Sequence, residues 1–166
     1  MGQRGGERGI RRAPVSPFCF GDVWGRRENV RGGVGEGVKV AMKTVEGGGL
    51  GTASQALGIA VGAFEASLAY AQERKQFGKP IGSNQAIQWK LADMDVAIEA
   101  GRNLYLKAAW LKDQAEPYTH AASRAKLFCS EMAMKATIDG VQIHGGNGYT
   151  KDYNVERYMR DIKIFE

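Results

Sequence analysis

The sequence predicts an all-α fold, an antiparallel helical bundle with a short irregular or β-stranded remnant at its N-terminus. Apolar residues recur at three- and four-residue steps through most of the chain after residue 50, which is the spacing of one helix face. Short turn-forming segments separate these periodic stretches. Of the 23 glycines, 14 fall in residues 1–51, so the composition changes where the helical pattern starts. Long helices joined by short turns pack antiparallel, and we therefore expect a bundle.

Residues 1–33 are expected to be a Gly/Arg-rich remnant of a β domain, and residues 34–166 to form the bundle. A short apolar run with turn-forming flanks at residues 14–23 predicts one β-strand. Because a strand needs partners, we expect it to be the end of a sheet domain whose other strands are missing. Seven arginines and three acidic residues give residues 1–33 a charge of +4, out of +5 for the chain. No RNA-binding motif or interleaved aromatic residues accompany this charge, so nucleic acid is not an expected partner.

Metal and membrane sites are not expected either. Cys19 and Cys129 lie 110 residues apart, and the two histidines are isolated from them, which predicts small buried thiols rather than a metal site or a disulfide. The N-terminus lacks the apolar segment of a secretory signal. The longest apolar stretch, residues 51–71, contains Glu65, so we expect a buried helix rather than a membrane span.

The first predicted helix spans about Leu50–Lys75. The run Gly47-Gly48-Gly49 precedes it, and because a helical glycine costs roughly 1 kcal/mol relative to alanine, the helix is expected to begin or break there. Residues 77–80 read Phe-Gly-Lys-Pro and are expected to stop the helix and turn the chain. The inward-facing residues expected on this helix are Leu57, Ala60, Val61, Phe64 and Leu68.

Three further helices follow. Ser83 is placed to cap a helix over Asn84–Gln114, which at about 1.5 Å per residue is more than about 40 Å long. A proline-containing turn separates it from a helix over Tyr118–Ile143. The glycine-rich residues 145–148 end that helix, and Val155–Phe165 forms a shorter one. The inward-facing residues expected on the two long helices are Ile87, Leu91, Met94, Ile98, Tyr105 and Leu106, and then Ala125, Phe128, Met132, Ala136 and Val141.

Two motifs in the helical part resemble signatures of the C-terminal domain of the acyl-CoA dehydrogenase family. The first is ERKQFGKPI at residues 73–81, followed by Gln85, Gln88 and LADM at 91–94. The second is QIHGGNGY at residues 142–149, followed by DY at 152–153, VER at 155–157 and RDIKI at 160–164. A looser similarity to the family's last middle-domain strands extends the resemblance to about Gly9–Glu166.

The resemblance implies a flavin-dependent oxidoreductase. Members of the family bind FAD and an acyl-CoA thioester, remove hydrogens from the α and β carbons, and pass electrons to an electron-transferring flavoprotein. A carboxylate takes the α proton while a hydride leaves the β carbon, so the base needs a dry pocket and the thioester carbonyl needs hydrogen-bond donors. The resemblance also implies a homo-oligomer, a dimer of dimers. It implies a cytoplasmic protein in a bacterium and a mitochondrial matrix protein in a eukaryote.

The resemblance further implies which residues contact FAD. Arg74 and Gln85, with Phe77 beside them, are expected to contact the FAD of a neighbouring subunit, since a guanidinium offers a planar fork to pyrophosphate oxygens. The segment Gln142, Ile143, His144, Gly145 and Gly146 is expected to bring its backbone near the adenosine and pyrophosphate portion. Without the resemblance, Arg74 is an exposed helix end and the glycines are a helix C-cap, while His144 is expected to be a packed structural residue in either case.

The sequence departs from the family at the catalytic positions. The usual glutamate base falls three residues past Glu166, so Glu166 is not that base, and the alternative position on the first helix is held by Gly48. The family's substrate-binding Arg falls on Gly49 and its Asp on Glu46, which leaves Glu46 as the substrate-binding candidate. We therefore expect an incomplete, inactive fragment that does not hold FAD tightly. A non-catalytic helical oligomerisation module is the alternative, and a basic RNA-binding tail is a third.

Overall fold

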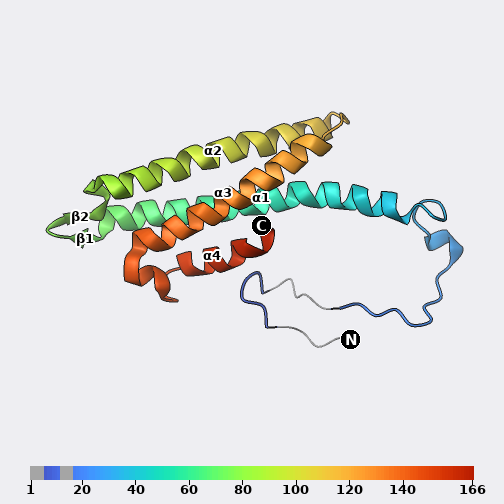
Figure 1. Cartoon of the computed structure of the whole chain (residues 1–166), viewed down its shortest axis with the longest axis horizontal. Helices are drawn as coiled ribbons and strands as arrows, with labels where there is room; N and C mark the ends of the chain where they lie inside the picture. The colour runs from blue at the N-terminus through green and yellow to red at the C-terminus, as the bar shows by residue number, and fades with distance from the viewer. Residues whose placement is uncertain (1–5, 12–16) are drawn as a thin grey trace.

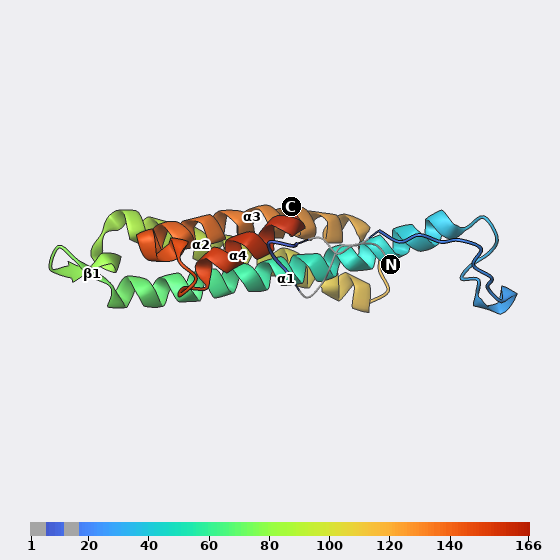
Figure 2. The ribbon, with the colours of Figure 1, turned by 90° about the horizontal axis from the view of Figure 1, so that it is seen from below.

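The computed structural model describes residues 6–11 and 17–166 and consists mainly of four helices (Figure 1). Helices α1 (Gly37–Glu73), α2 (Gln85–Asp113) and α3 (Thr119–His144) pack against one another as an antiparallel bundle. The short helix α4 (Val155–Ile162) packs against α3 and α1 (Figure 2). The predicted all-α bundle is confirmed, and no described helix is long and apolar enough to cross a bilayer.

Short elements connect the helices. The two-residue strands β1 (Lys75–Gln76) and β2 (Lys79–Pro80) pair antiparallel, with Lys75 opposite Pro80, between α1 and α2. Single turns of 3₁₀-helix span Arg27–Asn29, Ile81–Ser83, Gly145–Tyr149 and Lys163–Phe165. The hairpin and the 3₁₀ turn after α3 lie at the same end of the molecule in both ribbon views.

Helix α1 begins at Gly37 and passes through the three glycines without a break, so the predicted start at Leu50 is wrong. Extending an existing helix is far cheaper than nucleating one, and the well-packed turns after Leu50 supply the nucleus. Two side-chain hydrogen bonds add support. Thr52 Oγ1 donates to the Gly48 carbonyl at 2.9 Å, and Thr119 Oγ1 on α3 donates to Glu46 at 3.1 Å.

The other boundaries of the three long helices lie within two residues of their predicted positions, but the predicted cap of α2 is wrong. Ser83 Oγ donates to the Pro80 carbonyl at 2.7 Å, which keeps it in the preceding 3₁₀ turn. Asn84 takes the N-cap position with extended backbone and no side-chain capping bond. The last predicted helix, Val155–Phe165, is α-helical only to Ile162 and ends as 3₁₀-helix.

Small side chains dominate the core. The buried alanines include Ala53, Ala56, Ala60, Ala63, Ala108, Ala122, Ala125, Ala133 and Ala136. Small residues let helix axes approach closely, so the buried stripe on each helix is narrow. Leu57, Met94, Ile98 and Met132 are buried as predicted. Leu68, Leu106 and Phe128 are not, with 37%, 52% and 36% of their surface exposed, because they fall beside the narrow stripe rather than on it.

The N-terminal segment contains no strand among the residues that the structure describes. Residues 17–23 have no regular structure, and the predicted strand is wrong for them because no described neighbour offers a pairing edge; residues 14–16 lie outside the described part. Cys129 is buried as predicted, whereas Cys19 is exposed, contrary to the prediction, since it lies in the exposed segment 17–23.

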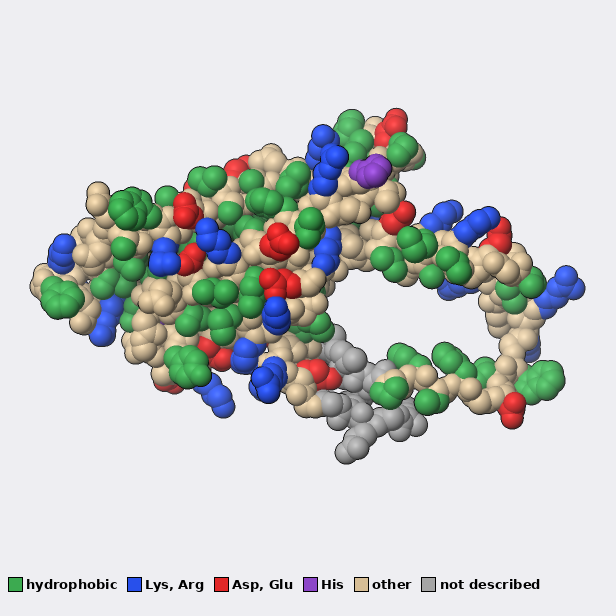
Figure 3. Space-filling view, in the orientation of Figure 1, with side chains coloured by type: hydrophobic (Ala, Val, Ile, Leu, Met, Phe, Trp, Pro, Cys, Tyr) green, Lys and Arg blue, Asp and Glu red, His purple; other side chains and the backbone are tan. Residues whose placement is uncertain are grey.

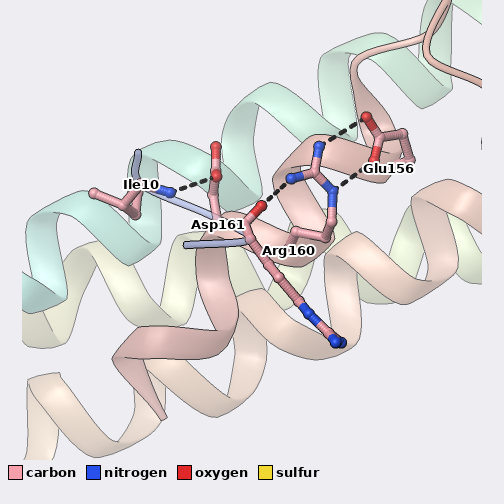
Figure 4. Close-up of polar contacts among 5 residues, drawn as sticks. Ile10, Glu156, Arg160 and Asp161 are labelled. Carbon is pink, nitrogen blue, oxygen red and sulfur yellow. Dashed lines mark hydrogen bonds and ion pairs between the residues drawn. The ribbon is translucent and has the colours of Figure 1, made fainter. Parts of the chain in front are cut away.

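Residues 8–10 return to the bundle and are held on α4 (Figure 4). Ile10 N–H donates to the Asp161 carboxylate at 2.8 Å, and the Arg160 guanidinium donates to the Arg8 carbonyl. Arg160 also forms a two-point ion pair with Glu156, with N···O distances of 2.7 and 2.9 Å. A side chain at Gly9 would overlap the Arg160 carbonyl, so this close approach requires glycine.

Candidate functional site

The tight hairpin after α1 carries an exposed aromatic ring. Phe77 and Gly78 both have positive φ, 52° and 79°, the arrangement of a type I′ turn between two strands. A phenylalanine in the left-handed region is uncommon, and the Phe77 ring is 98% exposed, so no packing within the chain explains it. An aromatic ring held in solvent at a rigid tip is available to a ligand or a second chain.

Arg74 lies at the C-terminal end of α1, beside this hairpin. Its backbone is fixed on both sides, since its N–H donates to the Tyr70 carbonyl at 2.9 Å and its carbonyl accepts from Ile81 N–H at 2.8 Å. Its side chain is exposed and forms no ion pair with any residue in the described ranges. Gln85, the first residue of α2, is also exposed. The Arg74 guanidinium and the Gln85 amide are therefore accessible to a ligand at this end of α1.

The turn after α3 has one buried face and one open face. Gly145 has φ +59° and ψ −134°, a conformation that strongly favours glycine. A Cβ atom at Gly145 or Gly146 would meet no other atom within 4 Å, so the backbone there is open. At Gly148 a Cβ would overlap the Val141 carbonyl, so that glycine is needed for packing inside the chain. Only the first two glycines offer accessible backbone.

Ile143 and His144 are buried, unlike the other predicted cofactor-contacting residues. Both side chains are buried, with 3% and 5% of their surface exposed, whereas Gln142 is exposed. His144 Nδ1 lies 2.8 Å from the Gly140 carbonyl, and because a carbonyl can only accept, Nδ1 carries the proton. Burial lowers the pKa of His144, which keeps the imidazole neutral. His144 has the environment expected of a structural residue.

The structure brings these two regions together. The Tyr70 and His144 rings stack with centroids 4.2 Å apart, and Asn147 donates to the Tyr70 hydroxyl at 2.9 Å. Because Tyr70 lies one helical turn before Arg74, residues 74–85 and 142–149 share one end of the molecule, which we call the hairpin end (Figures 1 and 2). Tyr70 is not among the predicted site residues, and its only sequence signal is its position four residues before Arg74. Asn147 lies inside the QIHGGNGY motif, but no role was predicted for it.

The open groups at the hairpin end fit a dinucleotide such as FAD in their chemistry. They combine one exposed guanidinium, one exposed amide, one exposed aromatic ring and the open backbone of two glycines. Pyrophosphate needs positive charge and N–H donors, and a base or flavin ring needs a flat apolar partner. No group of three or more His, Cys, Asp or Glu within the described residues is arranged to hold a metal ion.

The candidates for acyl-CoA contact lie elsewhere. Glu46 is 28 positions before Arg74, about 42 Å along α1 at about 1.5 Å per residue. Glu46 borders a cavity of about 450 Å³ between residues 42–52 of α1 and residues 119–126 of α3, a region we call the Glu46 end. The cavity is lined by Met42, Val45, Glu46, Gly49, Thr52, Thr119, Ala122, Ser123 and Lys126. Gly48 is exposed and offers no side chain for proton transfer.

Comparison with known proteins gives one consistent result. A sequence model described as "Acyl-CoA dehydrogenase, C-terminal domain" matches residues 35–166. The short-chain specific acyl-CoA dehydrogenase of Clostridium acetobutylicum is 52% identical over 158 residues, which cover 95% of this chain and 42% of that protein. The chain therefore spans less than half the length of this relative.

Solved structures agree with the sequence match. Butyryl-CoA dehydrogenase from Megasphaera elsdenii superposes with a TM-score of 0.96 at 45% identity, over 99% of this chain and 43% of that one. A chain in a structure described as the electron transferring flavoprotein of Acidaminococcus fermentans, studied for flavin-based electron bifurcation, also gives 0.96, at 48% identity over 99% of this chain and 43% of that one. The described fold, including the hairpin end, is therefore shared with these proteins.

Proposed function

Because this chain belongs to the acyl-CoA dehydrogenase family, we propose that it provides the helical part of an FAD-dependent oxidation of an acyl-CoA thioester. The observation that carries the proposal is the hairpin end, where the exposed residues Arg74, Phe77 and Gln85 lie at the same end of the molecule as the open backbone of Gly145 and Gly146. The names of the relatives support a short acyl chain as substrate and an electron-transferring flavoprotein as the electron acceptor. The compartment that fits this role is the bacterial cytoplasm or the mitochondrial matrix.

Each open group has a role toward FAD. The Arg74 guanidinium binds pyrophosphate oxygens, Gln85 donates or accepts a hydrogen bond, and the Phe77 ring packs on a flat ring of the cofactor. Gly145 and Gly146 let the backbone approach the adenosine and pyrophosphate portion, with Gln142 beside them and with Ile143 and His144 supporting the turn from the core. When bound, FAD supplies the acceptor for the hydride that leaves the β carbon.

Oligomerisation is part of the proposal. The cofactor candidates and the substrate candidate Glu46 are about 42 Å apart in one chain, which supports a site built from two copies, with the hairpin end of one facing the cofactor of another. Exposed apolar side chains on α2 and α3, among them Trp89, Val96 and Phe128, also support self-association. A dimer of dimers is the arrangement we propose.

Two positions on α1 bear on the proton transfer, and neither offers a side chain for it. Gly48 and Gly49 stand where some family members have a carboxylate base and a substrate-binding arginine, so residues 1–166 alone are not expected to turn over acyl-CoA. This pair of glycines is the observation that favours the second candidate, a non-catalytic helical oligomerisation module. The two candidates differ in whether FAD is bound.

The test uses the complete natural polypeptide that contains these 166 residues, purified and assayed for FAD absorbance and for dye reduction by butyryl-CoA. Arg74→Ala is expected to weaken FAD binding by roughly 10- to 100-fold, since a hydrogen bond to a charged group contributes about 1.5–3 kcal/mol. Arg124→Ala, at an exposed position on α3, is the matched control and is expected to leave the affinity unchanged. Self-association without FAD binding would favour the oligomerisation module instead.

A further inference from the structure

Tyr70 links the two halves of the hairpin end. It lies in the last turn of α1, and its carbonyl accepts from Arg74 N–H at 2.9 Å. Its ring stacks on His144 at 4.2 Å with an angle of 22° between the planes, and its hydroxyl accepts from Asn147 Nδ2 at 2.9 Å. The Tyr70 side chain therefore contacts His144, directly before the pair Gly145 and Gly146, and Asn147, directly after the pair.

The cluster holds the glycine turn from its inner side only. The Tyr153 ring meets Tyr70 and His144 edge-on, with centroids 5.5 Å away in each case. His144 is buried, and Tyr70, Asn147 and Tyr153 are half-buried. Nothing in the described chain lies within 4 Å of the outward positions on Gly145 and Gly146, so the four side chains orient the turn without covering its open face.

Stacking and hydrogen bonding fix different motions of the turn. Stacked rings hold the planes of Tyr70 and His144 together but still allow one to slide over the other. The Asn147 to Tyr70 hydrogen bond restricts this sliding because it joins Asn147, directly after the glycine pair, to the Tyr70 hydroxyl. One hydrogen bond and one stack therefore tie the turn to α1 next to Arg74, in addition to the packing of α3 on α1.

We propose that Tyr70 and Asn147 are positioning residues for a dinucleotide: they set the distance between the Arg74 guanidinium and the Gly145–Gly146 backbone so that both reach one pyrophosphate. This inference rests on the proposed function. Neither side chain touches the ligand, and each acts through the groups that do. Binding groups on two separate segments must be held within about 0.5 Å of the productive geometry, and a supporting contact of this kind provides that precision.

The test measures the Kd for FAD, by quenching of FAD fluorescence, in the complete natural polypeptide that contains this chain. Tyr70→Phe keeps the stack and removes the hydroxyl, whereas Asn147→Ala removes the donor. Each is expected to raise the Kd by roughly three- to tenfold, the effect of one hydrogen bond. The double variant is expected to bind no more weakly than the weaker single variant, because both changes remove the same bond.

A control separates positioning from general stability. Ser130→Ala removes a hydrogen bond to the Leu127 carbonyl at a buried site on α3, 15 residues before Gly145, and is expected to lower the thermal midpoint without changing the Kd. An unchanged Kd in Tyr70→Phe, or fully additive effects in the double variant, would overturn the inference. Absence of FAD binding in the unsubstituted polypeptide would instead overturn the proposed function, and this inference with it, before any variant is made.

Discussion

The Asp161 carboxylate accepts a hydrogen bond from Ile10 N–H at 2.8 Å, across 151 positions of sequence. Together with the Arg160 contact to the Arg8 carbonyl, it fastens residues 8–10 to α4 (Figure 4). The two-point ion pair with Glu156 orients Arg160 for this contact. The RDIKI motif thus has an intramolecular role that is independent of any ligand.

Gly9→Ala is expected to release residues 6–11 from α4. The added methyl group would overlap the Arg160 carbonyl, which belongs to the helix backbone and cannot rotate away. Amide hydrogen exchange at Ile10 should accelerate, and trypsin should cleave faster after Arg8 or Arg11. The control is Gly6→Ala, where a Cβ meets nothing within 4 Å. Equal exchange rates in the two variants would contradict the expected attachment.

Acidification is expected to destabilise the fold through His144. Burial lowers the pKa of His144 below its ordinary value of about 6.5, so the unfolded state binds more protons than the folded state between the two pKa values. This contribution to stability is present above about pH 6.5 and is lost as pH falls through the folded-state pKa, with a slope of at most about 1.4 kcal/mol per pH unit.

Urea unfolding between pH 7.5 and pH 5 measures this slope. His144→Gln should flatten it in that window, whereas His120→Gln, at an exposed position, should leave it as it is. The expectation fails if the unsubstituted chain is as stable at pH 5 as at pH 7.5.

Gly148→Ala and Gly146→Ala are expected to separate stability from binding. At Gly148 the new methyl would overlap the Val141 carbonyl, so we expect a loss of about 1–3 kcal/mol in the free energy of unfolding. At Gly146 nothing lies within 4 Å, so stability should change by less than about 0.5 kcal/mol while FAD affinity falls. Thermal unfolding and FAD titration, run on both variants, give the two readouts. A stable Gly148→Ala variant would show that the turn can rearrange.

Gly48→Ala is expected to stabilise the protein by about 0.5–1 kcal/mol, because Gly48 is helical and has open space around it. Gly35 also has open space, but its φ is +88°, so Gly35→Ala should be destabilising. Chemical denaturation measures the free energy of unfolding of both variants. Each adds one methyl group, at a helical position in Gly48→Ala and at a position of positive φ in Gly35→Ala. Opposite signs are expected, and equal signs would contradict the helical assignment of Gly48.

The sequence was sufficient to predict the helix ends that are marked by strong local signals. Gly145 ends α3 as predicted because its left-handed φ is a local requirement that glycine meets best. The run Gly47 to Gly49 was misleading, since local propensity is weak compared with a long helix already nucleated by packing. Leu68 and Leu106 were misplaced because periodicity gives the direction of a helix face but not its width.

In the candidate site, too, local features could be predicted from the sequence and tertiary contacts could not. Arg74, Phe77 and Gln85 could be selected from a motif, because their chemistry is carried by residue type and spacing. The Tyr70 contacts to His144 and Asn147 could not be predicted, since they join positions 74 and 77 residues apart and depend on how α1 and α3 cross. Asn147 belongs to the QIHGGNGY motif, but the motif does not indicate that its partner is Tyr70.

The first turns of α1 extend past the bundle and are unlike the hairpin end. Leu50 is the first buried residue of the helix, and Val38, Met42 and Val45 are exposed, as the hydrophobic side chains on this part of Figure 3 indicate. Breaking the backbone hydrogen bonds there gives up almost no core contact, so these turns open at a much lower free energy than the rest of α1. The exposed turns before Glu46 are therefore expected to take their final conformation from a neighbour that packs on them, whereas the hairpin end is held within the chain by the contacts of Tyr70 with His144 and Asn147.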